Sequence, residues 1–330
     1  MLTLFIFTHF LAIISCHMEN SGIPLPGKIA VEDNTNHTCV IYIDSSNGKT
    51  AFKIRNDQEV RYSGFTWLNK EDNFLGAESM PGLSRSDYKS NIAKFDLSGR
   101  IIERIYEAQN GEIAWLGYPS RNDKYLIFTT HRIVDPNLYP FEGLAPMLSL
   151  KIMDINEKKV FKIIDSIGRS PNFKLQESPW LNDGNRFVYS MSAENELMSG
   201  GKAINPLEEV LTGVYVYDLT TDQKTLLVPG GRLAIASPIS NQVAYVKDNS
   251  IRVLNLNTKE ERTVYQLGSK EKVPNIHWTP DGEFIYLAYF DYFFGLSDFP
   301  TSGEKLIEVN SGNEIAFKKI GQGLGTYTWK

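Results

Sequence analysis

The sequence has little cysteine, no excess of positive charge and no apolar run long enough to cross a membrane. Only two cysteines, Cys16 and Cys39, occur in 330 residues, so a disulfide framework is excluded as the basis of the fold. The net charge is -5 at pH 7 and both signs are mixed along the chain, which excludes the basic stripe of a nucleic-acid-binding protein. Hydrophobic residues make up 42% of the chain, enough for a globular core.

The usual signatures of catalysis are also missing. The sequence contains no Gly-x-Ser-x-Gly elbow, no His-Glu-x-x-His and no pair of Cys-x-x-Cys motifs. A glycine-rich segment at 321–325 is similar to a phosphate loop, but it precedes a predicted strand instead of a helix and is therefore rejected. Histidines do not occur at metal-ligand spacing within one element, so we predict no cofactor and no metal.

The N-terminal segment has the length of a secretion signal. An apolar run that extends from residue 2 to Ser15 is interrupted only by Thr3, Thr8 and His9, and it is shorter than a membrane-spanning helix. The run ends in Ile-Ile-Ser-Cys, which resembles the bacterial lipobox and implies a lipid anchor on Cys16. Because no Lys or Arg precedes the run, plain secretion and a buried strand remain alternatives. We expect a signal peptide over 1–16, a linker over 17–26 and a single domain over 27–330.

Internal repetition is the most informative feature of the chain. The first repeated pattern is a tryptophan followed by a polar turn and an apolar strand, with a degenerate copy at Ala236. We expect every tryptophan to occupy this one position and to pack between neighbouring sheets instead of stacking on a ligand. The tryptophans are Trp67, Trp115, Trp180, Trp278 and Trp329.

The second pattern is an apolar strand that ends in an acidic or amide residue, before a polar turn and another strand. Six copies occur, between 37 and 64 residues apart, which predicts four-stranded antiparallel units with insertions of variable length. The residues at the strand ends are Asp44, Asp96, Asp154, Asp218, Asn255 and Glu308. We expect the four aspartates to accept backbone hydrogen bonds in hairpin turns and not to act in catalysis.

The two ends of the domain predict how the units are joined. The first unit has three predicted strands, at 28–31, 39–44 and 49–54, and no tryptophan strand before them. The C-terminus supplies an unpaired tryptophan strand at 326–330. Joining the two removes the open sheet edges. The sequence therefore predicts an all-β, six-bladed β-propeller closed by the C-terminal strand, which completes the first blade.

One copy of the repeat carries a family resemblance. The segment that begins at Trp278, Trp-Thr-Pro-Asp-Gly-Glu-Phe-Ile, resembles the W-S-P-D-G-x-x-I repeat of TolB-like propellers, which are related to WD40-like repeats. The arrangement of the repeats resembles that of the family over residues 27–330, but only the last blade matches the sequence motif closely. It implies a propeller that binds a ligand outside the cytoplasm, in the periplasm or cell envelope. TolB has a further domain ahead of its propeller, so its own partnership is not implied.

Four insertions between the second and third strands of their units are expected to emerge on one face of the ring. They span 76–90, 131–147, 193–212 and 291–303. Aromatic residues occur in two of them, where exposed loops are usually polar, and this favours a binding surface. The alternative is that these rings cover the edges of their own blades. The predicted contact residues are Tyr139, Phe141, Tyr292 and Phe294, with His131 and Arg132 as polar partners.

Two functions from different classes follow. The first is a non-catalytic propeller that binds a protein, peptide or glycan through its long loops, with the membrane reached only through a lipid anchor. The second is a hydrolase, lyase or lactonase with a metal-assisted site at the mouth of the channel. Glu112, Glu177 and His277 are the candidates for that second site, because they lie near predicted innermost strands.

Overall fold

The structure is a computed structural model of the 330-residue chain. Within the residues that it describes, the secondary structure consists of strands, and none of it is helical. The described residues are Ile23, Gly27, 29–35, 38–45, 48–55, 60–80, 89–109, 111–132, 147–167, 172–174, 178–192, 212–269, 271–291, 301–317 and 326–329.

The described strands group into six four-stranded antiparallel units, numbered here in chain order. A single parallel bridge between Ser90 and Ile113 joins the second unit to the third. The first unit is β24 (Thr326–Trp329), β1 (Ile29–Thr35), β2 (Thr38–Ser45) and β3 (Gly48–Arg55); the second is β4 (Arg61–Trp67), β5 (Phe74–Met80), β6 (Lys89–Phe95) and β7 (Ile101–Tyr106); the third is β8 (Glu112–Pro119), β9 (Tyr125–Arg132), β10 (Met147–Asp154) and β11 (Lys159–Ile167); the fourth is β12 (Asn172–Lys174), β13 (Arg186–Ser192), β14 (Gly213–Asp218) and β15 (Gln223–Pro229); the fifth is β16 (Arg232–Ala236), β17 (Gln242–Lys247), β18 (Ser250–Asn255) and β19 (Glu261–Gln266); the sixth is β20 (Glu271–Trp278), β21 (Phe284–Asp291), β22 (Thr301–Glu308) and β23 (Glu314–Ile315).

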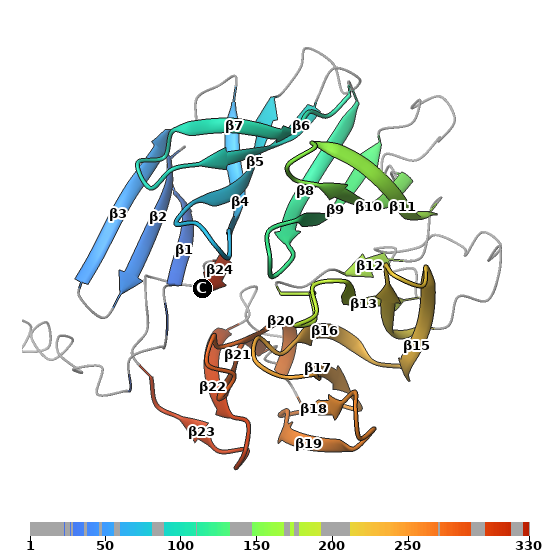
Figure 1. The fold of residues 1–330 in the computed structure, drawn as a ribbon. Helices are drawn as coiled ribbons and strands as arrows, with labels where there is room; N and C mark the ends of the chain where they lie inside the picture. Colours follow the sequence, from blue (N-terminus) through green and yellow to red (C-terminus); the bar gives the residue numbers. More distant parts are fainter. Residues whose placement is uncertain are drawn as a thin grey trace, which may run out of the picture.

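The C-terminal strand completes the first unit, as the sequence predicts. Strand β24 pairs with β1 in antiparallel register, with Ile29 opposite Trp329 and Ala30 opposite Thr328. Figure 1 shows the red β24 beside the blue β1, with the units arranged around a common centre. Pairing the two ends of the chain covers a sheet edge that would otherwise attract another strand. The predicted all-β propeller, closed by its last strand, is therefore confirmed.

Two of the buried tryptophans pack between neighbouring units. Trp180 is the largest fully buried side chain described, and its Nε1 donates a 2.8 Å hydrogen bond to the carbonyl oxygen of Tyr118 in the third unit. Trp278 belongs to a hydrophobic cluster that joins the fifth and sixth units. The packing prediction is confirmed for these two, whereas the ring of Trp67 packs against Phe74 of its own unit.

One tryptophan does not occupy the predicted position. Trp67 and Trp278 are the last residues of their strands and pair with Phe74 and Ile285 across the following turn. In β8 the corresponding residue, opposite Leu126, is Pro119, four positions after Trp115. The prediction for Trp115 was wrong because the turn begins only at Ser120, so the spacing from tryptophan to turn is longer in this unit.

The predicted turn aspartates accept backbone hydrogen bonds, as expected, wherever their side chains are described. Asp96 Oδ1 accepts hydrogen bonds from the backbone N–H groups of Ser98 and Arg100, at 2.8 and 3.0 Å. Asp154, Asp218 and Asn255 accept equivalent backbone bonds two and three residues ahead. A carboxylate or amide at this position satisfies donors that the tight turn leaves open. These residues belong to the scaffold.

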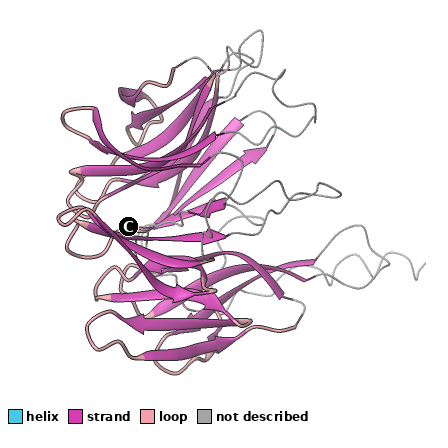
Figure 2. Cartoon of the chain, turned by 90° about the vertical axis from the view of Figure 1, so that its right-hand side faces the viewer, coloured by secondary structure: helices cyan, strands magenta, loops and turns pink. Residues whose placement is uncertain are grey.

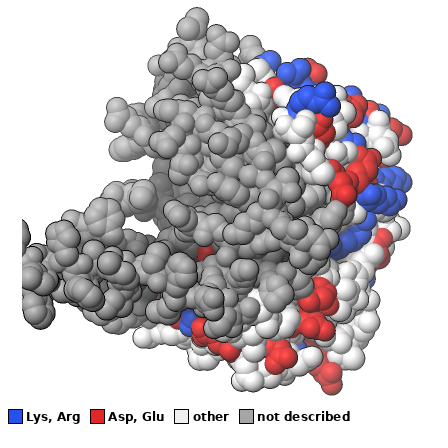
Figure 3. Space-filling view, turned by 90° about the vertical axis from the view of Figure 1, so that its left-hand side faces the viewer, with Lys and Arg blue, Asp and Glu red and all other residues white. Residues whose placement is uncertain are grey.

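The ring has two unlike faces. The short-turn face carries the hairpin turns that follow the innermost strands, at 68–73, 120–124, 181–185, 237–241 and 279–283. Figure 2 shows the described turns gathered along one side of the strands. Around the rim, Figure 3 shows Lys and Arg beside Asp and Glu on the part of the surface that is not grey, without a patch of one sign.

Candidate functional site at the long-loop face

The opposite face, called here the long-loop face, is where four second strands end and four third strands begin. The intervening segments contain 8 to 20 residues, whereas the equivalent segment of the fifth unit is only Asp248 and Asn249. Strands β5 and β6 extend further than expected, which shortens the first predicted insertion. The segments are 81–88, 133–146, 193–212 and 292–300.

Two of the predicted contact residues are strand residues. His131 and Arg132 are the last positions of β9, paired with Leu148 and Met147 of β10, so they lie at the base of segment 133–146 and not within it. Their side chains are outside the described part of the structure. Tyr139, Phe141, Tyr292, Phe294, Glu177 and Cys16 also lie outside the described residues.

Glu112 is held in a buried cluster beneath segment 133–146. It is the first residue of β8 and pairs with Arg132, from which that segment leaves. Its carboxylate forms an ion pair with Lys151 of β10 and accepts a 2.7 Å hydrogen bond from the hydroxyl of Tyr106. Lys151 Nζ lies 2.9 Å from that same hydroxyl, and the backbone N–H of Gln109 donates to Glu112 at 3.2 Å.

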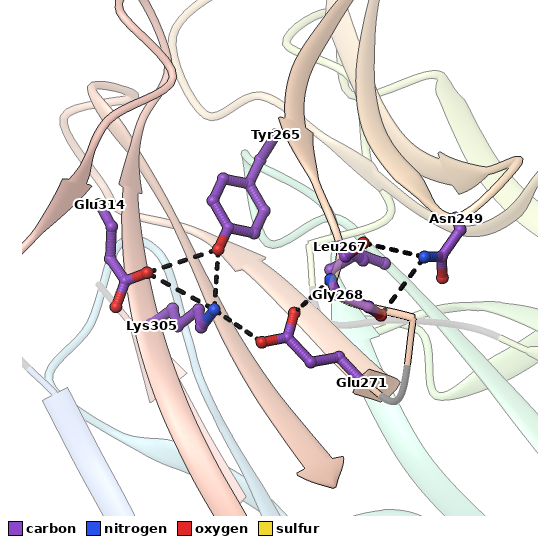
Figure 4. Close-up of polar contacts among 7 residues, drawn as sticks. All are labelled: Asn249, Tyr265, Leu267, Gly268, Glu271, Lys305 and Glu314. Atoms are coloured by element: carbon purple, nitrogen blue, oxygen red, sulfur yellow. Dashed lines mark hydrogen bonds and ion pairs between the residues drawn. The ribbon is translucent and has the colours of Figure 1, made fainter.

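The sixth unit contains a similar arrangement at the strand end from which segment 292–300 leaves, except that the hydroxyl of Tyr265 donates to Glu314 at 3.4 Å (Figure 4). Glu271 is the first residue of β20 and pairs with Asp291, from which that segment leaves. Lys305 Nζ lies 2.7 Å from Glu271 Oε1 and 2.7 Å from the hydroxyl oxygen of Tyr265. The backbone N–H of Gly268 donates to the other oxygen of Glu271 at 2.9 Å.

We call these two arrangements the Tyr–Glu–Lys clusters. In each, the tyrosine is one of the last two residues of the outer strand of one unit, while the glutamate and the lysine belong to the next unit, so the cluster joins neighbouring units. The clusters lie between units two and three and between units five and six, on opposite sides of the ring. Each cluster therefore lies at the strand end from which one of the two aromatic-containing segments leaves. Sequence reasoning missed Tyr106, Lys151, Tyr265, Glu271 and Lys305, although the spacing Tyr-x5-Glu recurs at 106–112 and 265–271.

A third buried carboxylate lies near the long-loop face of the second unit. Glu78 is 2% exposed and receives two hydrogen bonds from Arg104, at 2.7 Å from Nε and 3.0 Å from Nη2. Asn91 donates to it at 3.1 Å and accepts a bond from the backbone N–H of Ala108. Two backbone N–H groups between β7 and β8 are thus bonded to buried side chains: that of Ala108 to Asn91, which Glu78 holds, and that of Gln109 to Glu112.

These contacts shift the pKa values of the buried groups. Burial acts to raise the pKa of Glu112, but hydrogen bonds from Lys151 and Tyr106 outweigh it and hold the pKa below its ordinary value. Burial, reinforced by the charge of Glu112, raises the pKa of Tyr106. Burial would lower the pKa of Lys305, yet its bonds to Glu271 and Tyr265 raise it. Glu112 and Lys305 therefore remain charged at neutral pH.

The residues proposed for a channel site are not brought together. Glu112 begins an innermost strand at the long-loop face, whereas His277 is the next-to-last residue of β20, beside the short-turn face. Six residues of strand separate His277 from Glu271, the counterpart of Glu112, which corresponds to about 20 Å. His277 is buried, with its ring 6.0 Å from that of Tyr286. Glu112 and His277 therefore lie toward opposite faces of the ring.

Metal-ligand clusters and membrane-spanning helices would each indicate a particular kind of site. Among the described residues, no three His, Cys, Asp or Glu side chains lie close enough together to hold a metal ion. The same residues include no helix of the length and apolarity needed to cross a membrane.

Comparison with known proteins identifies the fold. No protein-family model and no curated protein sequence matches the chain. A solved structure described as a putative TolB from Agrobacterium tumefaciens superposes with a TM-score of 0.53 at 11% identity, covering 88% of each chain. The fold is a TolB-like β-propeller. An oligogalacturonate lyase from Vibrio parahaemolyticus superposes on this propeller with a TM-score of 0.54 at 10% identity, covering 87% of this chain and 78% of that one.

A further structure, an oligogalacturonate lyase in complex with manganese, has a TM-score of 0.50 at 13% identity and covers 89% of this chain and 72% of that one. At such identities the TolB-like propeller shares its fold with these proteins. A shared fold does not transfer an activity, because catalytic and binding residues are placed on a fold independently of it.

Proposed function

We propose that this protein is an exported propeller that binds an extended protein, peptide or glycan through its long-loop face without transforming it. The observation that carries the proposal is the pair of Tyr–Glu–Lys clusters beneath segments 133–146 and 292–300. Rigid support under a long connection lowers the ordering cost of binding. Because the two clusters lie across the ring from each other, a ligand that touches both segments spans the centre.

Aromatic residues of those two segments are the proposed contacts: Tyr139, Phe141, Tyr292 and Phe294, with His131 and Arg132 at the strand end. Export rests on the apolar segment 2–15 and the lipobox-like sequence before Cys16.

A metal-assisted lyase is the weaker alternative, because Glu112 is already neutralised by Lys151 and lies far from His277. A general acid or base needs a carboxylate that is free to exchange a proton near neutral pH.

Site-specific photo-crosslinking in cells tests the proposal. A photoreactive residue replaces Tyr139 in one variant, Tyr292 in a second and the exposed Glu157 of the short-turn face in a control. We expect one partner to crosslink from positions 139 and 292 and not from 157. The double variant Tyr139→Ala/Phe141→Ala should lose that partner in a pull-down. Crosslinking from position 157 alone, or an unchanged pull-down, contradicts the proposal.

A further inference from the structure

Arg121 lies in the turn between β8 and β9 and carries a charge that no described residue neutralises. Its Nε and Nη2 atoms are both buried, and neither has a hydrogen-bond partner within the described structure. A guanidinium removed from water is normally paired with a carboxylate or phosphate, because an uncompensated buried charge is costly. No acidic side chain in the described part of the chain therefore neutralises Arg121.

The carboxylate next to it in sequence is used elsewhere. Asp123 Oδ1 accepts hydrogen bonds from the backbone N–H of Asn69 at 2.9 Å and from its Nδ2 at 3.0 Å. The other oxygen, Oδ2, accepts the backbone N–H of Lys70 at 2.6 Å. Asp123 thus joins the third unit to the second and leaves Arg121 without an acid.

Other arginines of the short-turn face are paired. Arg186, in the turn of the fourth unit, donates from Nε to Asp183 Oδ2 at 2.5 Å, and Arg100 donates from Nε to Asp96 Oδ2 at 3.0 Å. Arg121 differs in its electrostatics as well, because burial lowers its pKa and no charged residue in the described structure counteracts this. Among these three arginines, the unpaired state is therefore confined to Arg121.

The turn lies where a ligand could reach several units. Figure 1 draws the connection between β8 and β9 on the side of its unit that faces the middle of the ring. Asn69 of the second unit contacts this turn on one side, through Asp123 and the carbonyl oxygen of Ser120. Gly184 of the fourth unit lies on the other side of this turn: a Cβ atom added to Gly184 would lie 3.7 Å from the side chain of Asn122.

We propose that Arg121 is the recognition residue of a second binding site, at the middle of the short-turn face, for a ligand that presents a carboxylate. The planar fork of a guanidinium matches the two oxygens of a carboxylate. A single uncompensated positive charge suits a monoanion better than a phosphate dianion. The site is on the opposite face from the long connections, so it does not depend on the function proposed above.

Arginine side-chain NMR of the full chain tests this proposal. The Nε–Hε signal of Arg121 is identified by its loss in Arg121→Gln, and N-acetylglycine serves as the carboxylate probe, with N-acetylglycinamide as its neutral counterpart. We expect the acid to shift this signal saturably and the amide to leave it unchanged. Arg121→Lys, which keeps the positive charge but loses the planar guanidinium, should weaken the binding of N-acetylglycine about tenfold. Arg186→Gln should respond as the wild type does.

The melting temperature distinguishes a binding role of Arg121 from a structural one, because replacing a structural arginine would lower it. Without the probe, Arg121→Gln should melt on the order of 2 °C higher than the wild type, since it removes an unpaired buried charge. The Tyr139→Ala/Phe141→Ala variant should keep the NMR response, which separates this site from the long-loop face. A response to inorganic phosphate but not to N-acetylglycine overturns the carboxylate assignment. A lower melting temperature for Arg121→Gln without any response to the acid overturns the site itself.

Discussion

Lys305 and Glu271 form a 2.7 Å ion pair across their sheet, and Lys151 and Glu112 repeat it in the third unit. Each lysine lies three residues before the acid that ends its strand, Glu308 in one unit and Asp154 in the other. Side chains in both pairs are 10–14% exposed. Pairs as buried as these are costly to break from one side, because the remaining charge stays out of water.

Lys305→Met should therefore destabilise the protein by about 2 kcal/mol, since Glu271 loses its partner. Lys272→Met is the matched control, because Lys272 is exposed in the same part of β20 and its loss should cost less than about 0.5 kcal/mol. Urea unfolding followed by tryptophan fluorescence measures both. Equal effects of the two variants would contradict a role for the cluster in joining the fifth and sixth units.

Acid should remove the contribution of Glu112. Its pKa is lowered in the folded state, so the unfolded chain binds the proton first as the pH falls. The stabilisation is complete above the ordinary glutamate value of 4.5 and is lost as the pH falls through the lower folded value. Melting temperatures from pH 6 to pH 2 should fall less steeply for Glu112→Gln than for the wild type. Glu283→Gln, at an exposed turn position, should leave the slope unchanged.

Gly282 should tolerate a side chain less well than Gly230. Both adopt a positive φ, 70° and 72°, which costs an alanine about 1 kcal/mol. A Cβ at Gly282 would also approach Ile239 Cγ1 to 2.6 Å, whereas a Cβ at Gly230 meets nothing within 4 Å. We expect Gly282→Ala to cost about 2 kcal/mol and Gly230→Ala about half of that. In an Ile239→Ala background, Gly282→Ala should destabilise the protein no more than Gly230→Ala does. If Gly282→Ala still costs about 2 kcal/mol there, contact between turns 237–241 and 279–283 is contradicted.

The fold could be predicted because each unit repeats short-range chemistry. Asp96, Asp154 and Asp218 bond to the backbone two to four residues ahead, so a turn acid and the strand before it are visible within a short stretch of sequence. The closing strand could be predicted because the first unit lacks a tryptophan strand and the C-terminal segment supplies an unmatched one. Trp115 misled the alignment because its turn starts later than the turns of the other units.

The candidate site was less predictable because its contacts join distant positions. Glu112 and Lys151 are 39 residues apart, and Glu271 and Lys305 are 34 apart, with a whole hairpin between them. No local pattern says which lysine meets which glutamate. Only the recurrence of Tyr-x5-Glu, followed by a lysine three residues before a turn acid, could have indicated the two clusters. The missing partner of Arg121 is likewise invisible in sequence, since Asp123 lies two positions away.

The pairing of Ile29 with Trp329 joins positions 300 apart, so the first sheet is complete only when two distant segments of the chain meet. Until β24 pairs with it, strand β1 has one side open. Long-range pairing of this kind slows folding and prolongs exposure to aggregation. A chaperone that covers β1 during that interval would therefore raise the yield of folded protein more than one acting on the fifth unit, whose strands are consecutive in the chain.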